Sequence, residues 1–316
     1  MNVLVLGGEG FIGSHLVEAL VATGHRVSLF DRDRGPLLPE SVRASVRTAY
    51  GDFCDTEKLM PVLDSVDVVY HLISTTLPKS SNESPLFDVT SNVCGTLNML
   101  EKARASGVRK VVFVSSGGTV YGIPQSLPLS EAHPTEPICS YGITKLAVEK
   151  YLHLFHTLYG LDYAVLRVSN PYGDRQQAGR GQGVIGTFVN RIVNGNPIEI
   201  WGDGEVIRDY IHVSDVIAAL LRSADDTGAD KIFNIGSGVG HSLKQILSCL
   251  HEITGVLPDV RWSEQRSFDV PKNVLDIARA TRSLAWSPRV ALIDGIRSVY
   301  ESAVASRGAA STQFSR

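Results

Sequence analysis

A run of glycines near the start constrains this chain more than any other feature of its sequence. The aliphatic residues 3–6 lead directly into Gly7-Gly8-Glu9-Gly10-Phe11-Ile12-Gly13, after which a helical pattern begins. Glycines at positions 7, 10 and 13 permit a tight turn and a close approach of the helix to the strand. The backbone N–H groups of Phe11 and Ile12 then lie at the positive end of the helix, where a pyrophosphate can bind. This arrangement predicts a dinucleotide-binding fold.

The first two-thirds of the chain supports this prediction, because short β-branched runs alternate there with longer amphipathic patterns. Such alternation is typical of an α/β protein with a doubly wound parallel sheet, the Rossmann fold, which carries helices on both faces. We expect strands over residues 3–6, 26–30, 46–50, 66–70, 110–115 and 163–168, and helices near residues 12–23, 56–63, 91–106 and 141–159.

Beyond Asn170 the pattern loosens and predicts a smaller α/β C-terminal lobe that binds the substrate. We expect a loop over residues 171–183, a helix near 187–193, a strand near 198–201, a last sheet strand at 232–235 and a helix near 243–253. The predicted division gives residues 1–169 to the dinucleotide-binding domain, with segments near 208–235 returning to it, residues 170–207 and 236–305 to the lobe, and residues 306–316 to a flexible tail. A ligand would lie between the two parts, beyond the carboxyl ends of the strands.

Composition excludes several other classes of protein. A net charge of −3, from 30 basic and 33 acidic residues, gives no reason to expect nucleic acid or an anionic membrane as a partner. No apolar run approaches the roughly 18 residues needed to span a bilayer, and the N-terminus lacks the pattern of a signal peptide. The cysteines are scattered without a CxxC pair, which predicts free thiols in the cytoplasm and no metal site; they are Cys54, Cys94, Cys139 and Cys249.

Two acidic residues follow the second and third predicted strands. A carboxylate at Asp31 can accept hydrogen bonds from the adenosine ribose and repels a 2′-phosphate, which favours NAD over NADP. Arg32 and Arg34 lie close behind and could neutralise such a phosphate if the loop turned inward, so NADP stays an alternative here. Asp52, after the third strand, could accept a hydrogen bond from the adenine amino group.

The segment Tyr141-Gly142-Ile143-Thr144-Lys145 gives the chain a candidate acid–base pair. Residues four apart lie above one another on a helix, so the phenol and the ammonium share one face. A cation about 5 Å away, at an effective dielectric of about 20, favours phenolate by roughly 3 kcal/mol and lowers the tyrosine pKa by about two units. We therefore expect Tyr141 to act as a proton carrier near neutral pH.

Taken together, these segments resemble the extended short-chain dehydrogenase/reductase family, in its NAD-dependent nucleotide-sugar epimerase and dehydratase branch, typified by UDP-glucose 4-epimerase. The resemblance extends from Met1 to about Tyr300. The matching segments are the glycine run at 7–13, Asp31, Gly51-Asp52-Phe53, His71-Leu72, Asn92 with Gly95-Thr96, Ser115-Ser116, Val120-Tyr121-Gly122, Tyr141 with Lys145, Arg208-Asp209-Tyr210-Ile211-His212-Val213, and Asn234-Ile235-Gly236-Ser237-Gly238.

This resemblance implies a tightly held NAD and transient oxidation at C4 of a nucleotide-linked hexose, with hydride return to the opposite face. Tyr141 would take and return the C4 hydroxyl proton, and Lys145 would orient the nicotinamide ribose. The resemblance adds Phe53, Leu72, Asn92 and Ser115 to the cofactor-binding residues. It also implies a homodimer that pairs through the helices near residues 92–106 and 141–159.

The chain departs from the family at Gly117, where a Ser or Thr usually lies four residues before the tyrosine of the Val-Tyr-Gly segment. A neighbouring hydroxyl must replace it, and we favour Thr119 over Ser116; alternatively Tyr141 works alone. The related 4,6-dehydratases carry an Asp-Glu pair here. Because Gly117 and Gly118 supply neither acid nor base, we do not expect dehydratase activity.

At the substrate end, the resemblance implies a nucleoside diphosphate held by arginines, as in a UDP- or dTDP-hexose. Charge-assisted hydrogen bonds from guanidinium groups suit a diphosphate. The implied substrate-binding residues are Asn170, Val184, Arg208, Arg266 and Asp269.

The leading interpretation is thus an NAD-dependent nucleotide-sugar 4-epimerase. The first alternative is an epimerase or reductase of a dTDP- or GDP-linked 6-deoxyhexose in cell-surface polysaccharide biosynthesis. The second is a non-catalytic dinucleotide sensor, against which the presence of both Tyr141 and Lys145 counts.

Overall fold

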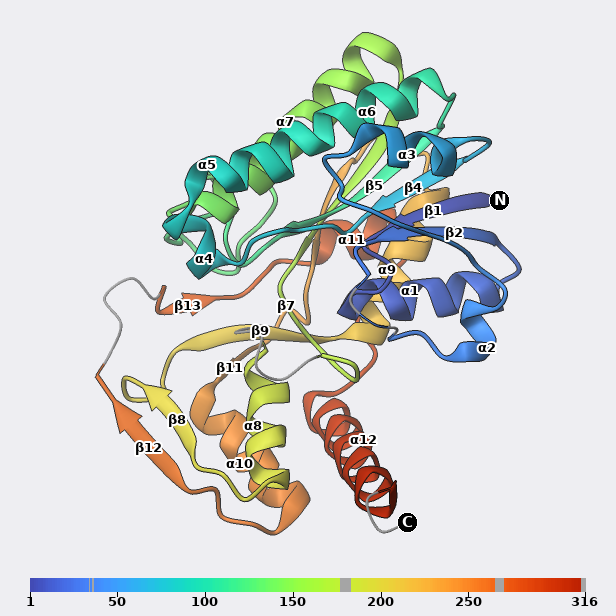
Figure 1. Ribbon diagram of the computed structural model, residues 1–316. Coiled ribbons are helices and arrows are strands. Elements are labelled where there is room, and N and C mark those ends of the chain that lie inside the picture. Colours follow the sequence, from blue (N-terminus) through green and yellow to red (C-terminus); the bar gives the residue numbers. More distant parts are fainter. Residues whose placement is uncertain (34, 36, 177–182, 265–269, 314–316) are drawn as a thin grey trace.

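The computed structural model describes residues 1–33, 35, 37–176, 183–264 and 270–313. At its centre lies a seven-stranded parallel sheet in the order β10-β6-β5-β4-β1-β2-β3 (Figure 1). The strands are β1 (Asn2–Leu6), β2 (Arg26–Asp31), β3 (Arg47–Tyr50), β4 (Val68–His71), β5 (Lys110–Ser116), β6 (Asp162–Val168) and β10 (Ile232–Ile235). The central strands are buried along nearly their whole length, as parallel strands covered on both faces must be. The predicted doubly wound α/β fold is confirmed.

Helices cover both faces of this sheet (Figure 1). On one face α1 (Phe11–Ala22) and α9 (Val213–Asp225) pack together, and their apolar residues share a core with Trp286. On the other face lie α3 (Thr56–Leu63), α6 (Gly95–Ala105) and α7 (Ser140–Tyr159). The strand order reverses between β1 and β4, so the crevice for a ligand opens at the carboxyl ends of these strands.

A smaller lobe follows, with a core of its own built from α8 (Val184–Val193), α10 (Leu243–Thr254) and α12 (Leu292–Gln313). The paired strands β8 (Ile198–Trp201) and β12 (Val260–Ser263) lie beside them. Between lobe and main sheet runs a second sheet of β7 (Asn170–Tyr172), β9 (Ile207–His212), β11 (Gly240–Ser242) and β13 (Lys272–Asn273). Short helical segments complete the chain: α2 (Glu40–Arg43), α4 (Pro78–Glu83), α5 (Pro85–Asp88), the π-helical turn η1 (Val89–Cys94) and α11 (Ala278–Ser283).

Several elements differ from the sequence-based expectations. The start of the expected loop is strand β7, because it pairs with β9, a partner distant in sequence. The helix expected near 91–106 is divided into η1 and α6. Helix α12 continues to Gln313, into the stretch expected to be a tail. Within the range assigned to the lobe, α11 and Trp286 pack against the main sheet, so the exact domain boundaries stay a prediction. No helix of the described residues is long and apolar enough to cross a membrane.

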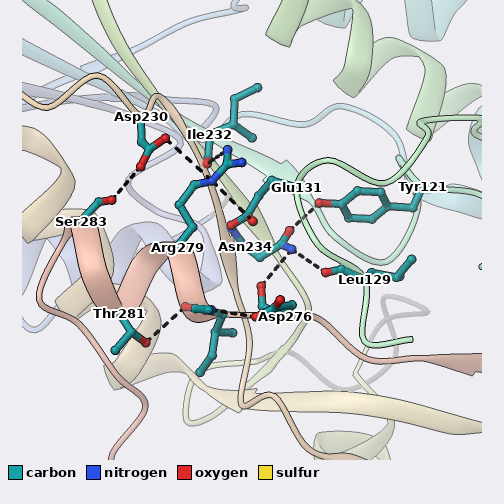
Figure 2. A network of polar contacts seen from close by, with 12 residues as sticks. Tyr121, Leu129, Glu131, Asp230, Ile232, Asn234, Asp276, Arg279, Thr281 and Ser283 are labelled. Carbon is teal, nitrogen blue, oxygen red and sulfur yellow. Dashed lines mark hydrogen bonds and ion pairs between the residues drawn. The ribbon is translucent and has the colours of Figure 1, made fainter. Parts of the chain in front are cut away.

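One buried side chain connects the segments that meet beside β10, as Figure 2 shows. Asn234, on β10, accepts a hydrogen bond from the hydroxyl of Tyr121 at 2.6 Å and donates to the carbonyls of Leu129 and Asp276. The carboxylate of Glu131 accepts from the backbone N–H of Asn234 at 2.8 Å. Asn234 therefore holds the long loop after β5 in place, and that loop carries candidate site residues.

Replacing Asn234 should lower the stability of the whole molecule. Asn234→Leu removes the hydrogen bonds of this side chain to the buried hydroxyl of Tyr121 and to the carbonyls of Leu129 and Asp276, which should lower the free energy of unfolding by about 3 kcal/mol. Thr281→Ala, which removes an exposed hydroxyl on α11 shown in the same view, should change it by less than about 0.5 kcal/mol. Urea unfolding followed by circular dichroism measures both. Equal stability of the two variants would contradict the role of Asn234.

Candidate functional site

The glycine turn has the geometry that a pyrophosphate site requires. Gly7 has a φ of +88°, a left-handed conformation that favours glycine, and its carbonyl accepts a hydrogen bond from the N–H of Gly10 at 3.1 Å. A Cβ on Gly13 would collide with the carbonyl of Gly7, so only glycine lets α1 begin this close to β1. Phe11 and Ile12 form the first turn of α1, where backbone N–H groups have no partner within the helix.

Asp31 lies at the end of β2 and faces this turn. Its carboxylate accepts hydrogen bonds from the backbone N–H groups of Glu9 at 2.9 Å and Arg32 at 2.7 Å. The Arg32 side chain pairs with Asp52 at 3.0 Å, and Asp52 also accepts from the N–H of Cys54. That hydrogen bond to the Cys54 backbone is the largest cause that lowers the pKa of Asp52. Arg34 lies outside the described residues.

The other predicted cofactor residues line the carboxyl ends of β1 and β4. Phe53 is buried against the ring of His71, and its ring lies so close to Gly95 that a side chain there would collide. Leu72 is partly buried, and its backbone N–H extends the sheet by bonding to Leu6. Asn92 accepts from the N–H of Thr75 at 3.0 Å and thereby holds the loop after β4.

Tyr141 and Lys145 lie on the first turns of α7, with the ammonium Nζ 5.6 Å from the centroid of the phenol ring. Gly142 permits this arrangement, because a Cβ there would lie 2.8 Å from the carbonyl oxygen of Thr119. The helix therefore begins against the loop after β5. Lys145 is buried and donates to the carbonyl of Val114 at 2.9 Å, and its ammonium lies over the Phe113 ring.

The expectation that Lys145 lowers the tyrosine pKa is wrong. Burial is the dominant influence and raises the pKa of Tyr141 to about 12, while a hydrogen bond with the side chain of Ser74 opposes this rise. Burial also lowers the pKa of Lys145 to about 8, against the opposing negative charges of Asp88 and Glu149. The sequence argument treated the pair as partly solvated, and it omitted the desolvation that disfavours the charged form of each group.

Behind Lys145 lies a buried ion pair. Glu149, one turn along α7, accepts from the guanidinium of Arg167 on β6 at 2.6 Å and from the hydroxyl of Ser115 on β5. The hydroxyl of Ser115 is thus engaged by Glu149, and any cofactor contact of this residue would come from its remaining atoms.

Gly117 is enclosed by the segment that returns after β13. A Cβ at this position would lie 2.6 Å from a methyl of Leu275 and 3.0 Å from the carbonyl oxygen of Arg167. The side chain of Asn273 donates to the Gly117 carbonyl at 3.2 Å. A serine or threonine therefore does not fit without displacing Leu275, which explains the departure from the family. Two residues on, the hydroxyl of Thr119 is buried and has no hydrogen-bond partner among the described residues.

Two of the predicted substrate residues, Asn170 and Arg208, lie in the sheet that contacts Gly117 through Asn273. Asn170 begins β7 and donates to the carbonyl of Asp209 at 2.9 Å, and Arg208 lies on the adjoining strand β9. Asn273 is paired with Arg208 in the same sheet, so its contact with Gly117 connects this sheet to the loop after β5. Val184 begins α8. Arg266 and Asp269 lie outside the described residues.

The sequence analysis missed Ser74, Asp88, Asn273 and the Glu149–Arg167 pair. Glu149 follows Lys145 by one helical turn, a spacing that could have predicted its position on the same face. The others could not be found in this way, because β4, α5, β6 and β13 approach α7 and the loop after β5 only in the folded chain.

A comparison with protein families matches residues 3–236 to the NAD dependent epimerase/dehydratase family. The chain belongs to this family. The predicted family and cofactor are thereby confirmed: the protein is an enzyme of the epimerase/dehydratase family, and NAD is its cofactor.

Individual relatives of this epimerase/dehydratase-family enzyme cover almost its full length. UDP-glucose 4-epimerase of Mycolicibacterium smegmatis is 36% identical over 307 residues, which cover 95% of this chain and 98% of the relative. The dTDP-4-dehydro-6-deoxyglucose reductase of Escherichia coli is 34% identical, with 95% and 97% covered. The crystal structure of UDP-glucose 4-epimerase from Thermotoga maritima with UDP-glucose superposes with a TM-score of 0.92 at 35% identity, covering 97% of this chain and 100% of that chain.

The unpartnered hydroxyl of Thr119 can be tested directly. If it bonds the reacting group, Thr119→Val should lower kcat about 10- to 100-fold, the worth of one hydrogen bond to a charged group. Thermal stability should stay equal or rise, because the variant removes a buried hydroxyl that has no partner among the described residues. Ser116→Ala is the matched control, for which we expect a smaller loss of activity. A larger loss in Ser116→Ala would assign the role to Ser116 instead.

Proposed function

We propose that this enzyme is an NAD-dependent nucleotide-sugar 4-epimerase, in which Tyr141 moves the proton of the C4 hydroxyl. The observation that carries the proposal is the placement of a half-buried phenol beside a buried ammonium, at the carboxyl end of the sheet whose first strand leads into the glycine turn. The neighbouring Asn170 and Arg208 extend from the lobe side of the same region.

The glycine turn fits the pyrophosphate of NAD, since side chains at Gly10 and Gly13 would approach the Gly7 carbonyl. Gly7 and the N–H groups of Phe11 and Ile12 would hold the phosphates, and Asp31 the adenosine ribose. Beside that ribose site the buried carboxylate of Glu9 accepts from the N–H of Leu37. Together with Asp31, this second carboxylate would repel a 2′-phosphate. In this arrangement Asp52 and Phe53 would border the adenine, while Leu72, Asn92, Ser115, Tyr141 and Lys145 would border the nicotinamide half.

When bound, NAD supplies an acceptor that takes a hydride from the sugar carbon and gives it back. The residues of the chain handle the proton. The phenolate oxygen of Tyr141 accepts the C4 hydroxyl proton as the carbonyl forms, and the same oxygen returns it after the sugar ring has turned its other face. Because burial raises the pKa of Tyr141, the positive charge of bound oxidised nicotinamide would have to favour the phenolate. Thr119, with its unpartnered hydroxyl, would donate to the reacting oxygen.

The substrate is proposed to be a UDP- or dTDP-hexose. The support is the diphosphate-binding chemistry of Arg208, together with Arg266 and Asp269 from the sequence, and the relatives named for UDP-glucose. Asn170 would contact the sugar end and Val184 the nucleoside. A second candidate, reduction of a dTDP-linked 4-keto-6-deoxyhexose, is favoured by the reductase from Escherichia coli among the relatives.

A panel of UDP-, dTDP- and GDP-sugars distinguishes these activities. We expect the purified protein to carry bound NAD and to invert C4 of at least one UDP- or dTDP-hexose without added cofactor, as followed by proton NMR. Dependence on added NADH or NADPH, with net reduction of a keto sugar, would support the second candidate. If every sugar in the panel is returned unchanged, both candidate functions are contradicted.

Removing the hydroxyl of Tyr141 tests its role as the proton carrier. Tyr141→Phe should fold normally, keep NAD, and lose about 10²–10⁴ in kcat, the usual contribution of one acid–base group. Tyr151→Phe, further along the same helix and outside the site, should keep wild-type activity. Full turnover by Tyr141→Phe would remove Tyr141 from the reaction.

We further propose a cytoplasmic homodimer, for which α5 and α7 supply support. Exposed apolar side chains gather on these two packed helices, among them Leu86 on α5 and Ile143, Leu154 and Leu158 on α7. An apolar group of this kind on a folded surface marks an interface. A second copy of the chain would cover it.

Measuring the molecular mass in solution tests whether the protein is a dimer. We expect light scattering to give twice the chain mass of 34.2 kDa, and Leu158→Glu to shift the protein to the monomer because it buries a charge in the interface. Leu257→Glu, on an exposed residue of the lobe, should remain dimeric. A monomeric wild-type protein at all concentrations would refute the proposal.

A further inference from the structure

We propose that Asp88 is a positioning residue: it fastens the turn of α7 that carries Tyr141 and Lys145 to the loop that carries Ser74, and it sets a negative charge beside the pair. This inference rests on the proposed function. Asp88 ends α5, is fully buried, and was not among the residues expected from the sequence to act in the site.

Four hydrogen bonds from neutral side chains converge on this carboxylate. Oδ2 accepts from the hydroxyls of Ser140 at 2.7 Å and Thr144 at 3.3 Å, the residues immediately before Tyr141 and Lys145. Oδ1 accepts from the hydroxyl of Thr76 at 2.5 Å and the amide of Asn92 at 2.8 Å. One side of Asp88 therefore holds α7, and the other holds the loop after β4.

That loop matters to the site because it carries Ser74. The side chain of Ser74 forms the hydrogen bond that opposes the rise in the pKa of Tyr141, and its hydroxyl donates to the carbonyl of Thr76 at 3.1 Å. The positions of Ser74 and Tyr141 are thus both fixed relative to Asp88, through Thr76 on one side and Ser140 on the other.

Capping of α7 does not explain this carboxylate. The first N–H groups of α7 are already satisfied by α4, since Ser140 donates to Asn82 at 2.9 Å and Tyr141 donates to Ser81 at 3.0 Å. Within the part of the chain that the structure describes, the carboxylate of Asp88 accepts only from side chains. A neutral asparagine could make the same four contacts, because a hydroxyl accepts as well as donates. Burying a charge here is costly unless the charge has a partner.

Lys145 is the cation on which this charge acts. The charge of Asp88 raises the pKa of Lys145 more than any other group, and it also raises the pKa of Tyr141. The other titratable groups that face the pair are Glu149, which also raises the lysine pKa, Cys139, which raises the tyrosine pKa, and His71, whose own pKa is lowered by Lys145. Without Asp88 the ammonium would lose its proton at lower pH, and so would the phenol.

Asp88→Asn tests the charge while keeping the shape. In protein labelled with 13C at lysine Cε, Lys145 should titrate near pH 8 in the wild type, far below solvent-exposed lysines, and its signal should be absent from Lys145→Met. We expect the midpoint to fall by about one unit in Asp88→Asn, the lower end of the effect of a neighbouring opposite charge. Asp215→Asn removes another buried carboxylate, which accepts from the backbone of Arg289 and Val290, and should leave the midpoint unchanged.

The pH dependence of turnover supplies the second measurement. Both limbs of the kcat profile should move to lower pH in Asp88→Asn with KM within about twofold, because the variant keeps the substrate contacts. Ser140→Ala keeps the charge but removes one fastening, so it should lower kcat several-fold without moving the lysine midpoint. This variant tests the fastening even if Asp88→Asn does not fold.

An identical lysine midpoint in wild type and Asp88→Asn would overturn the electrostatic half of the inference. A wild-type kcat in Ser140→Ala would overturn the inference that Asp88 holds α7 to the loop after β4. Neither result depends on which sugar is used, and the NMR titration needs no turnover. A protein that converts no sugar would therefore refute the proposed function while leaving the effect of Asp88 on the Lys145 titration measurable.

Discussion

The buried ammonium of Lys145 determines how the groups around it are arranged. Burial of this ammonium lowers its pKa to about 8. A buried ammonium stays charged only near groups that compensate its charge. The structure provides the carboxylates of Asp88 and Glu149 and the carbonyl of Val114. Each comes with its own supporting contacts, so one charge organises the packing of α7 against the sheet and against the loop after β4.

Glu149 extends this organisation across the sheet. Its ion pair with Arg167 is almost fully buried, and the guanidinium lies over the ring of Tyr121 at 4.9 Å. Tyr121 in turn bonds to Asn234 on β10. A continuous set of contacts therefore runs from the helix that carries the candidate acid–base residue to the edge strand. Removing one member of a buried pair of this kind is far more damaging than replacing both, because it leaves an uncompensated charge.

The lobe contributes to the same region through short segments. Leu275 and Asn273 press against Gly117, which leaves no room there for the usual serine or threonine. The carboxylate of Asp209 accepts from the backbone of Ser237, Gly238 and Leu275 and joins these segments to β9. The proposed sugar site is thus shaped by residues that return from the end of the chain, and its one unpartnered hydroxyl, among the described residues of the loop after β5, is that of Thr119.

The sequence by itself determined the parts of this protein whose chemistry is local. The glycine turn, the acidic end of β2, the strand–helix alternation and the four-residue spacing of Tyr141 and Lys145 all depend on neighbours in the chain, so they could be predicted. Strands β7 and β13 and helix α11 could not, because each depends on a partner far away in sequence. The acidity of Tyr141 was misjudged for the same reason. Desolvation depends on what covers a group, and only tertiary structure brought burial, Ser74 and Asp88 to that phenol.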